Sequence, residues 1–386
     1  MIAYNNEWLG HLDIRKQTAE AFDADCLTKD ELTNINNKYP VGFYTPNIFI
    51  RIGLFVLTII ILLFSLGLLA LVFLSALDEG LFSGLTIFFA ILCYVSLEYM
   101  IRTKNHYCSG VDDGLLWGAS VALFCGISLP NDLSGLTNCL IICMISLGAT
   151  LRYADKLMAS VANFSLVGIF FYICVELSGI AKAISPFIIM AISLAIYLAV
   201  TRSTIKKNNP YFTGCLKMIE ISALISLYAA GNYYAVRELS NSMFNLNLQP
   251  GDSIPFVWLF WVFTILIPVI YVARGIQKKD AVLIRVGLIL FAAIVFTVRY
   301  YHTVLPAEIL MTIGGIVLLV ISYGLMKWLH EPVYGFTSRE LSSKNASDKS
   351  QIESLIIAQT FKPGSGPEGT QFGGGSTGGG GASGEY

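Results

Sequence analysis

The stretch that decides the fold is residues 52–77, IGLFVLTIIILLFSLGLLALVFLSAL, which contains 26 residues and no charged side chain. About 20 apolar residues in helical form cross the hydrocarbon core of a bilayer, so this stretch is long enough to span it with some tilt. It is predicted to be a transmembrane helix. Further apolar runs follow as far as His330. Together they predict an all-α, polytopic bundle of transmembrane helices.

The composition of the chain supports this class. Of its 386 residues, 55% are hydrophobic and 13% are charged, and the mean hydropathy is +0.66. A soluble protein has about 25% charged residues. The net charge of −1 gives no reason to expect a nucleic-acid partner. No cleavable signal peptide is expected, because the N-terminal residues lack a basic region followed by an apolar stretch.

The distribution of lysine and arginine predicts the topology, because basic loops are retained in the cytosol. The ten predicted spans are 52–77, 81–101, 115–130, 136–151, 157–179, 186–201, 218–236, 256–276, 281–304 and 309–330. If they alternate, one side collects 14 basic residues and the other only Lys182 and Arg237. Arg285 and Arg299 are not counted, since they lie inside predicted spans. Both termini are therefore expected in the cytosol.

Two of the predicted spans are short. Residues 115–130 and 136–151 are 16 residues each and are joined by the polar sequence NDLSG. Such helices barely cross a bilayer, at about 1.5 Å of rise per residue. The alternative is a re-entrant hairpin, which leaves eight spans and the same alternation of charge.

The two ends of the chain are polar. Residues 1–47 are predicted to form a cytosolic unit of two short helices, the second starting at a capping box of Thr28 and Glu31. Residues 331–386 are predicted to be a flexible cytosolic tail, with a short apolar segment at 351–361 and a glycine-rich end. The tail residues expected to bind a partner are Leu355, Ile356, Ile357, Phe361 and Phe372.

No catalytic or cofactor motif is found. GxGxxG and GxSxG spellings at 364–369 and 374–378 lie in the glycine-rich tail, where composition produces them by chance. The four histidines do not cluster with cysteines, and the eight cysteines show no CxxC spacing. Buried, inert thiols are the expected state of these cysteines. No cofactor, no metal and no enzymatic activity is predicted.

Several ionisable residues lie near the inner ends of the spans. Glu98 precedes Arg102 by four residues, which predicts an ion pair at the cytosolic rim. Lys217, Glu220 and Arg285 are expected to reach the boundary by snorkelling. All of these are predicted to have structural roles.

A second group of polar residues is expected near the external face. It consists of Glu176, Asn232, Arg299, His302 and Glu308, which come from four predicted spans. These residues can line a polar pocket open to the outside, with Arg299 paired to Glu176 or Glu308. The structural alternative is a salt bridge that locks the last helical hairpin.

Two features concern helix packing. Ser222, Ser226 and Ala230 recur every four residues, which predicts a face that packs closely on another helix. Pro268 predicts a kink in the span at 256–276, because its ring displaces a backbone hydrogen bond.

Two parts of the sequence resemble known proteins. The opening LTKDELTNINNKYPVGFYTPNIFIRIGLFVLT, the RYY at 299–301 and the span beginning IGGIVLL at 313 resemble a group of multi-pass membrane proteins of Bacteroides-type bacteria. The tail sequence FGGGSTGGGGASG resembles the glycine-rich ends of bacterial membrane proteins that carry a TPM domain, although this chain shows no such domain. The resemblance implies a bacterial inner membrane and transfers no catalytic residue.

Two functions are carried forward from the sequence. The first is a membrane-embedded assembly or anchoring component that binds protein partners through its cytosolic ends, with self-association left open. The alternative is a transporter or channel for a small solute, which would use the outer polar group. An intramembrane enzyme ranks third, because no nucleophile and base occur at a recognisable spacing.

Overall fold

A computed structural model describes residues 2–23, 26–73, 79–176, 180–205, 210–244, 254–278 and 280–301, with scattered helical residues between 312 and 327. The helices are α1 (Asn6–Asp23), α2 (Lys29–Lys38), α3 (Ile48–Val72), α4 (Glu79–Lys104), α5 (Val111–Ser128), α6 (Gly135–Tyr153), α7 (Lys156–Glu176), α8 (Ile180–Ile205), α9 (Thr213–Gly231), α10 (Tyr233–Phe244), α11 (Val257–Lys278) and α12 (Ala281–Tyr301). Short 3₁₀ turns, Leu129–Asn131 and Pro210–Phe212, follow α5 and precede α9.

The fold is an all-α, polytopic membrane bundle, as predicted. In the described part of the chain, nine helices are long and apolar enough to cross a membrane. They include α6 and α5 with its 3₁₀ extension, which favours two full spans over a re-entrant hairpin. Most of the tenth expected span, at 309–330, lies outside the described residues.

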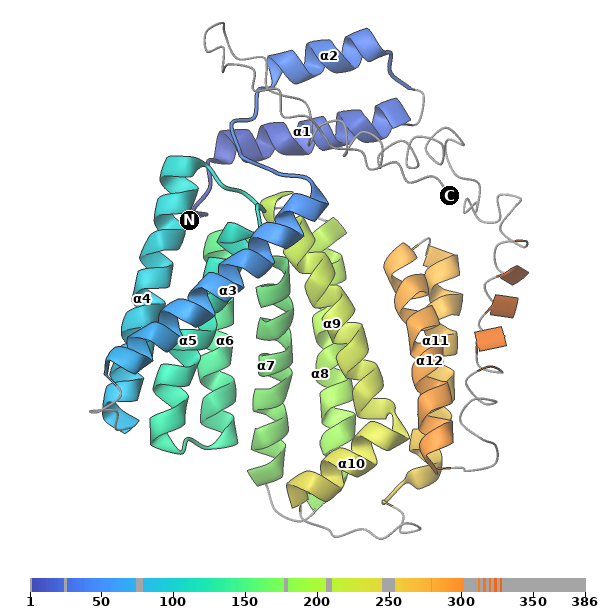
Figure 1. The fold of residues 1–386 in the computed structure, drawn as a ribbon. Coiled ribbons are helices and arrows are strands. Elements are labelled where there is room, and N and C mark those ends of the chain that lie inside the picture. Colours follow the sequence, from blue (N-terminus) through green and yellow to red (C-terminus); the bar gives the residue numbers. More distant parts are fainter. Residues whose placement is uncertain are drawn as a thin grey trace, which may run out of the picture.

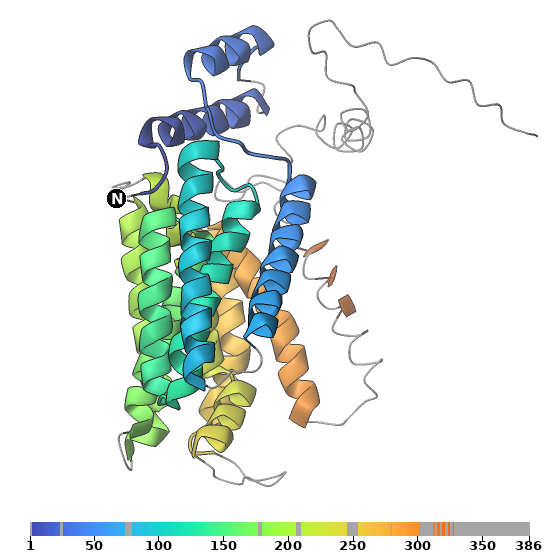
Figure 2. The same ribbon diagram turned by 60° about the vertical axis from the view of Figure 1, so that its left-hand side comes forward.

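The bundle is built from antiparallel pairs. Helix α4 packs on α5, α6 on α7, α8 on α9, and α11 on α12 (Figures 1 and 2). Helix α9 also contacts α7, α10, α11 and α12, and 56% of the residues in its most apolar stretch are buried. Its small residues Ser222, Ser226 and Ala230 are all buried, so the predicted packing face is confirmed. Helix α9 is therefore the centre of one half of the bundle.

Helix α3 lies at the side of the bundle, where it crosses α5 diagonally (Figure 1). Most of its apolar side chains are exposed, and Phe64 reaches 76%. Exposure of this kind suits contact with lipid chains. The N-terminal helices α1 and α2 lie across one end of the bundle, outside the spans.

Basic residues gather at the end of the bundle that carries α1 and α2. We call it the basic end; α3, α5, α7 and α9 start there, and α4, α6 and α8 finish there. Arg51, Arg102, Lys104, Arg152, Lys156 and Arg202 belong to these helix ends. The opposite end carries α10, which lies across the bundle (Figure 1).

The structure corrects two sequence predictions. The helix expected over 218–236 is interrupted, because Asn232 is extended (φ −80°, ψ 127°) between α9 and α10. Glu220 does not snorkel: it is only 6% exposed, because it lies on the central helix, whereas Lys217 and Arg285 are exposed. Pro268 lies inside α11, and the helix continues on both sides of it.

Candidate functional site

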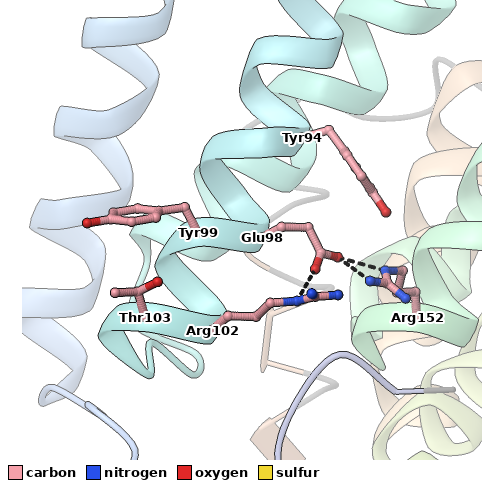
Figure 3. Close-up of a pocket in the computed structure, with 6 residues that line it drawn as sticks. All are labelled: Tyr94, Glu98, Tyr99, Arg102, Thr103 and Arg152. Carbon is pink, nitrogen blue, oxygen red and sulfur yellow. Dashed lines mark hydrogen bonds and ion pairs between the residues drawn. The ribbon is translucent and has the colours of Figure 1, made fainter.

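The basic end carries an ion-pair network centred on Glu98 of α4. Its Oε2 lies 2.9 Å from Arg102 Nε, which confirms the predicted pair. Its Oε1 accepts a hydrogen bond from Arg152 Nε of α6 at 2.7 Å (Figure 3). The same oxygen accepts one from Tyr153 Oη of α6 at 2.8 Å. The Glu98 side chain is 14% exposed. The network therefore joins the ends of two spans across 54 residues of sequence.

A second polar group joins α3 to the start of α5. Arg51 donates from Nε and Nη2 to Asp113 Oδ2, at 3.0 and 2.7 Å. The loop that joins α4 to α5 turns sharply, because Asn105, Cys108 and Gly110 all have positive φ. Ser109 is fully buried and donates to Asp112 Oδ1 from both its backbone N and its hydroxyl. These bonds start α5 four residues before the predicted span.

His106, Ser109 and Asp112 contain the residue types of a hydrolytic triad, in a different arrangement. The Ser109 hydroxyl lies in the middle, 2.7 Å from His106 Nδ1 and 2.9 Å from Asp112 Oδ1. A nucleophilic serine needs the histidine between it and the carboxylate, and it needs access to substrate. Because Ser109 has no exposed surface, the three residues hold the loop rather than perform catalysis.

The N-terminal unit is fixed to the basic end. The backbone N of Ala3 donates to the carbonyl of Arg152 at 2.8 Å, and that of Tyr44 donates to Asn105 at 2.9 Å. The Tyr4 ring meets Tyr107 edge-on, with centroids 4.9 Å apart. Phe43 stacks on Tyr107 and meets Trp8. Hydrogen bonds and aromatic contacts thus hold residues 3–8 and 43–44 against the bundle.

Helices α1 and α2 form one rigid hairpin. Arg15 donates to the carbonyls of Tyr39 and Asn36, at 2.8 and 2.6 Å. The predicted capping box is present: Thr28 accepts from the backbone N of Glu31, and its own backbone N donates to the Glu31 carboxylate at 2.8 Å. These bonds hold the pKa of Glu31 below its usual range.

Two tyrosines and one cysteine at this end are kept neutral by burial. Burial raises the pKa of Tyr4 and of Tyr107, and it raises the pKa of the Cys108 thiol to about 11. At neutral pH the thiol is protonated, and a protonated thiol is a weak nucleophile and a poor metal ligand. Within the described ranges, no group of three histidine, cysteine or acidic side chains has a geometry that could hold a metal ion. All eight cysteines are free thiols.

The residues of the outer polar group fall in different surroundings. Asn232 is 4% exposed; its Nδ2 donates to Tyr228 Oη and Thr297 Oγ1, and its Oδ1 accepts from the backbone N of Ala235. It thus caps α10 and ties the interruption to α12. Glu176 is exposed at the end of α7, and Arg299 is half-buried near the end of α12. His302 and Glu308 lie outside the described residues.

Side chains of neighbouring helices form hydrogen bonds near Asn232, where the helix is interrupted. The backbone N of Tyr233 donates to Thr264 Oγ1 of α11 at 3.0 Å. One turn into α10, Arg237 pairs with Glu238 at 3.1 Å and lies over the Tyr301 ring, 5.2 Å from its centroid. Irregular backbone inside a membrane protein has to find such partners, because lipid offers none. Arg237 lies inside α10, although its place between two apolar runs predicts a loop, and the sequence does not predict these contacts.

Three buried, uncharged side chains in the described part of the chain have polar atoms without a hydrogen-bond partner. They are Asn163 on α7, Ser193 on α8 and Ser226 on α9, each at most 6% exposed. The three helices pack on one another. A buried amide without partners costs about 1–3 kcal/mol, so these side chains are unusual in a packed interior.

Comparisons with models of protein families, with curated proteins and with solved structures found no match to this chain. Its function has therefore to be argued from its own geometry. The predicted tail residues Leu355, Ile356, Ile357, Phe361 and Phe372 lie outside the described residues.

Proposed function

We propose that the protein is a membrane anchor that presents its N-terminal hairpin to a soluble protein partner. The observation that supports this proposal is the contrast between the two sides of residues 1–47. One side is tied to the bundle by Ala3, Tyr4 and Phe43, whereas α2 has no buried residue. A helix that is held in place and left uncovered is a suitable surface for a partner.

The chemistry of α2 suits a water-soluble partner. Its sequence, KDELTNINNK, combines both signs of charge with three asparagines. The distribution of lysine and arginine supports a cytosolic position for the hairpin, and the resemblance of the sequence supports a bacterial inner membrane. The function proposed is thus the anchoring or assembly of cytosolic protein at that membrane. The C-terminal tail would offer a second contact.

Site-specific photocross-linking in living cells tests the anchor proposal. A photoreactive residue replaces Asn34, which is exposed on α2, or Asn131, which is exposed at the opposite end. We expect one discrete adduct from position 34 and none from position 131. Replacing Arg15 of α1 with alanine removes the hydrogen bonds to the carbonyls of Asn36 and Tyr39 that hold the end of α2 on α1, and it should abolish the adduct while the protein stays in the membrane.

The outcomes of this experiment separate the alternatives. A chain ending at Ser350 that still gives the adduct assigns the partner to the hairpin rather than to the tail. An adduct of twice the protein's own mass indicates self-association. Equal labelling from positions 34 and 131 would overturn the anchor proposal.

The second candidate is a pathway for a small, uncharged polar solute. It is favoured by the unpartnered side chains of Asn163, Ser193 and Ser226, which lie on three helices in contact. Polar groups inside a membrane bundle often mark a solute path, and uncharged groups suit an uncharged solute. The interruption between α9 and α10 belongs to the same half of the bundle.

Replacing Asn163 with leucine tests the second candidate. Leucine has the same branching and the same number of heavy atoms as asparagine, so stability to heating should be unchanged or higher, because two unpaired polar atoms are removed from the core. If the pathway exists, glycerol flux into proteoliposomes, followed by stopped-flow light scattering, falls to the level of protein-free vesicles. Equal flux in the wild type and the variant would contradict it.

A further inference from the structure

A pocket lies at the basic end between the last turns of α4 and α6. It is lined by Tyr94, Glu98, Tyr99, Arg102, Thr103 and Arg152, and its volume is about 420 Å³ (Figure 3). Five of these residues belong to α4, and Arg152 belongs to α6. The pocket therefore lies where two spans leave the membrane, at the level of the lipid headgroups.

The pocket carries a net positive charge. Two guanidinium groups face one carboxylate, and Arg152 is held by Glu98 through Nε and Nη2. Arg102 is only loosely held: its Nε lies 2.9 Å from Glu98 Oε2, yet that oxygen accepts no aligned hydrogen bond in the described part of the chain. The Arg102 side chain is 68% exposed. Its N–H groups can therefore reach a further acceptor.

The surroundings of the pocket indicate where that acceptor comes from. Tyr94 and Tyr99 are 43% and 53% exposed on the membrane-spanning helix α4. Tyrosines at this level are typical of the headgroup region, where the ring lies among acyl chains and the hydroxyl reaches water. Phosphate groups of the lipids are the acceptors present there, and arginine binds phosphate with strong, charge-assisted hydrogen bonds.

We propose that this pocket binds the phosphate group of an anionic phospholipid from the leaflet at the basic end. Arg102 donates to the phosphate, Arg152 keeps Glu98 in place, and Tyr99 and Thr103 line the same pocket. A single excess positive charge matches a headgroup with one net negative charge, such as phosphatidylglycerol. The same chemistry would also suit free phosphate, and the experiment distinguishes the two.

Native mass spectrometry of the full chain tests this proposal. The protein is extracted from nanodiscs that contain phosphatidylcholine and a small fraction of phosphatidylglycerol. We expect one retained phosphatidylglycerol per chain. Replacing Arg102 with glutamine removes a charge-assisted hydrogen bond and should lower its retention about tenfold. Lys104→Gln is the matched control, because Lys104 is exposed two residues further along and does not line the pocket.

Each of the other outcomes overturns the proposal. Equal retention of the two lipids shows that the pocket has no preference for a negative headgroup. An equal loss in the Arg102 and Lys104 variants shows attraction to diffuse surface charge. Displacement of the lipid by millimolar inorganic phosphate shows a site for a free anion. Thr103→Val, which keeps all charges and the side-chain volume, replaces Arg102→Gln if that variant does not fold, and a twofold or greater loss of retention is expected.

Discussion

Replacing Gly110 with alanine is expected to destabilise the protein by about 3 kcal/mol or more. Gly110 has φ +93°, a conformation that L side chains rarely adopt. A Cβ atom there would overlap the carbonyl oxygen of Arg51 and lie 2.9 Å from the backbone N of Phe55. Both atoms belong to the backbone of α3, so no side-chain rotation relieves the overlap. Helix α3 would have to move away from α5.

Heating followed by size-exclusion chromatography in detergent measures this effect. Gly53→Ala is the matched control. Gly53 lies on α3, the helix that Gly110 contacts, and a Cβ atom there meets nothing within 4 Å. Alanine is a better helix former than glycine by about 0.5–1 kcal/mol, so this variant should survive heating as well as the wild type or better. Similar losses in the two variants would show that α3 does not depend on its close contact with Gly110.

The sequence was sufficient to predict the position of most spans, because hydropathy over about 20 residues reflects a demand that the bilayer makes of each helix separately. Local pairs were also predictable, because they too depend on one short segment of the chain. The Thr28–Glu31 capping box and the Glu98–Arg102 pair each join residues within one turn of helix, and both are present. Helix start and end signals of this kind need no knowledge of the rest of the chain.

The contacts between distant segments could not be predicted in this way. Arg152 joins Glu98 from another helix, and Ala3 reaches the carbonyl of Arg152 although five helices separate the two residues along the chain. The early start of α5 depends on Arg51, because its guanidinium allows Asp113 to lie inside the first turn. Only the packing of the helices brings these residues together.

The sequence contains a signal for the interruption at Asn232, but a search based on hydropathy does not detect it. Gly231 and Asn232 are residues that commonly end one helix and cap the next. They lie between apolar residues, so a search for long apolar runs joins the two helices. The partners that satisfy the interruption, Thr264 and Thr297, lie on other helices. Asn232 was also one of the five residues predicted to line a polar pocket. In the structure its side chain forms hydrogen bonds with Tyr228, Thr297 and Ala235 of the same chain.

Replacing Arg152 with leucine is expected to destabilise the protein by about 3 kcal/mol, because it leaves Glu98 buried with one weaker cationic partner. The value is at the lower end for a buried pair, since the Arg152 side chain is 34% exposed and Tyr153 still donates to Glu98. Arg102→Leu removes a cation from the same carboxylate, but at a position 68% exposed. It should cost less than about 1 kcal/mol.

A double variant separates the loss of the ion pair from the loss of packing. In Glu98→Gln with Arg152→Leu, no buried carboxylate remains, so most of the stability lost in the single Arg152 variant should return, as measured by heating and size-exclusion chromatography. A double variant as unstable as the single one would assign the loss to the packing of Arg152, whose guanidinium carbon lies 5.9 Å from the centroid of the Tyr153 ring. The distinction bears on the pocket, because Arg152 can position Glu98 there only if the two charges are energetically coupled.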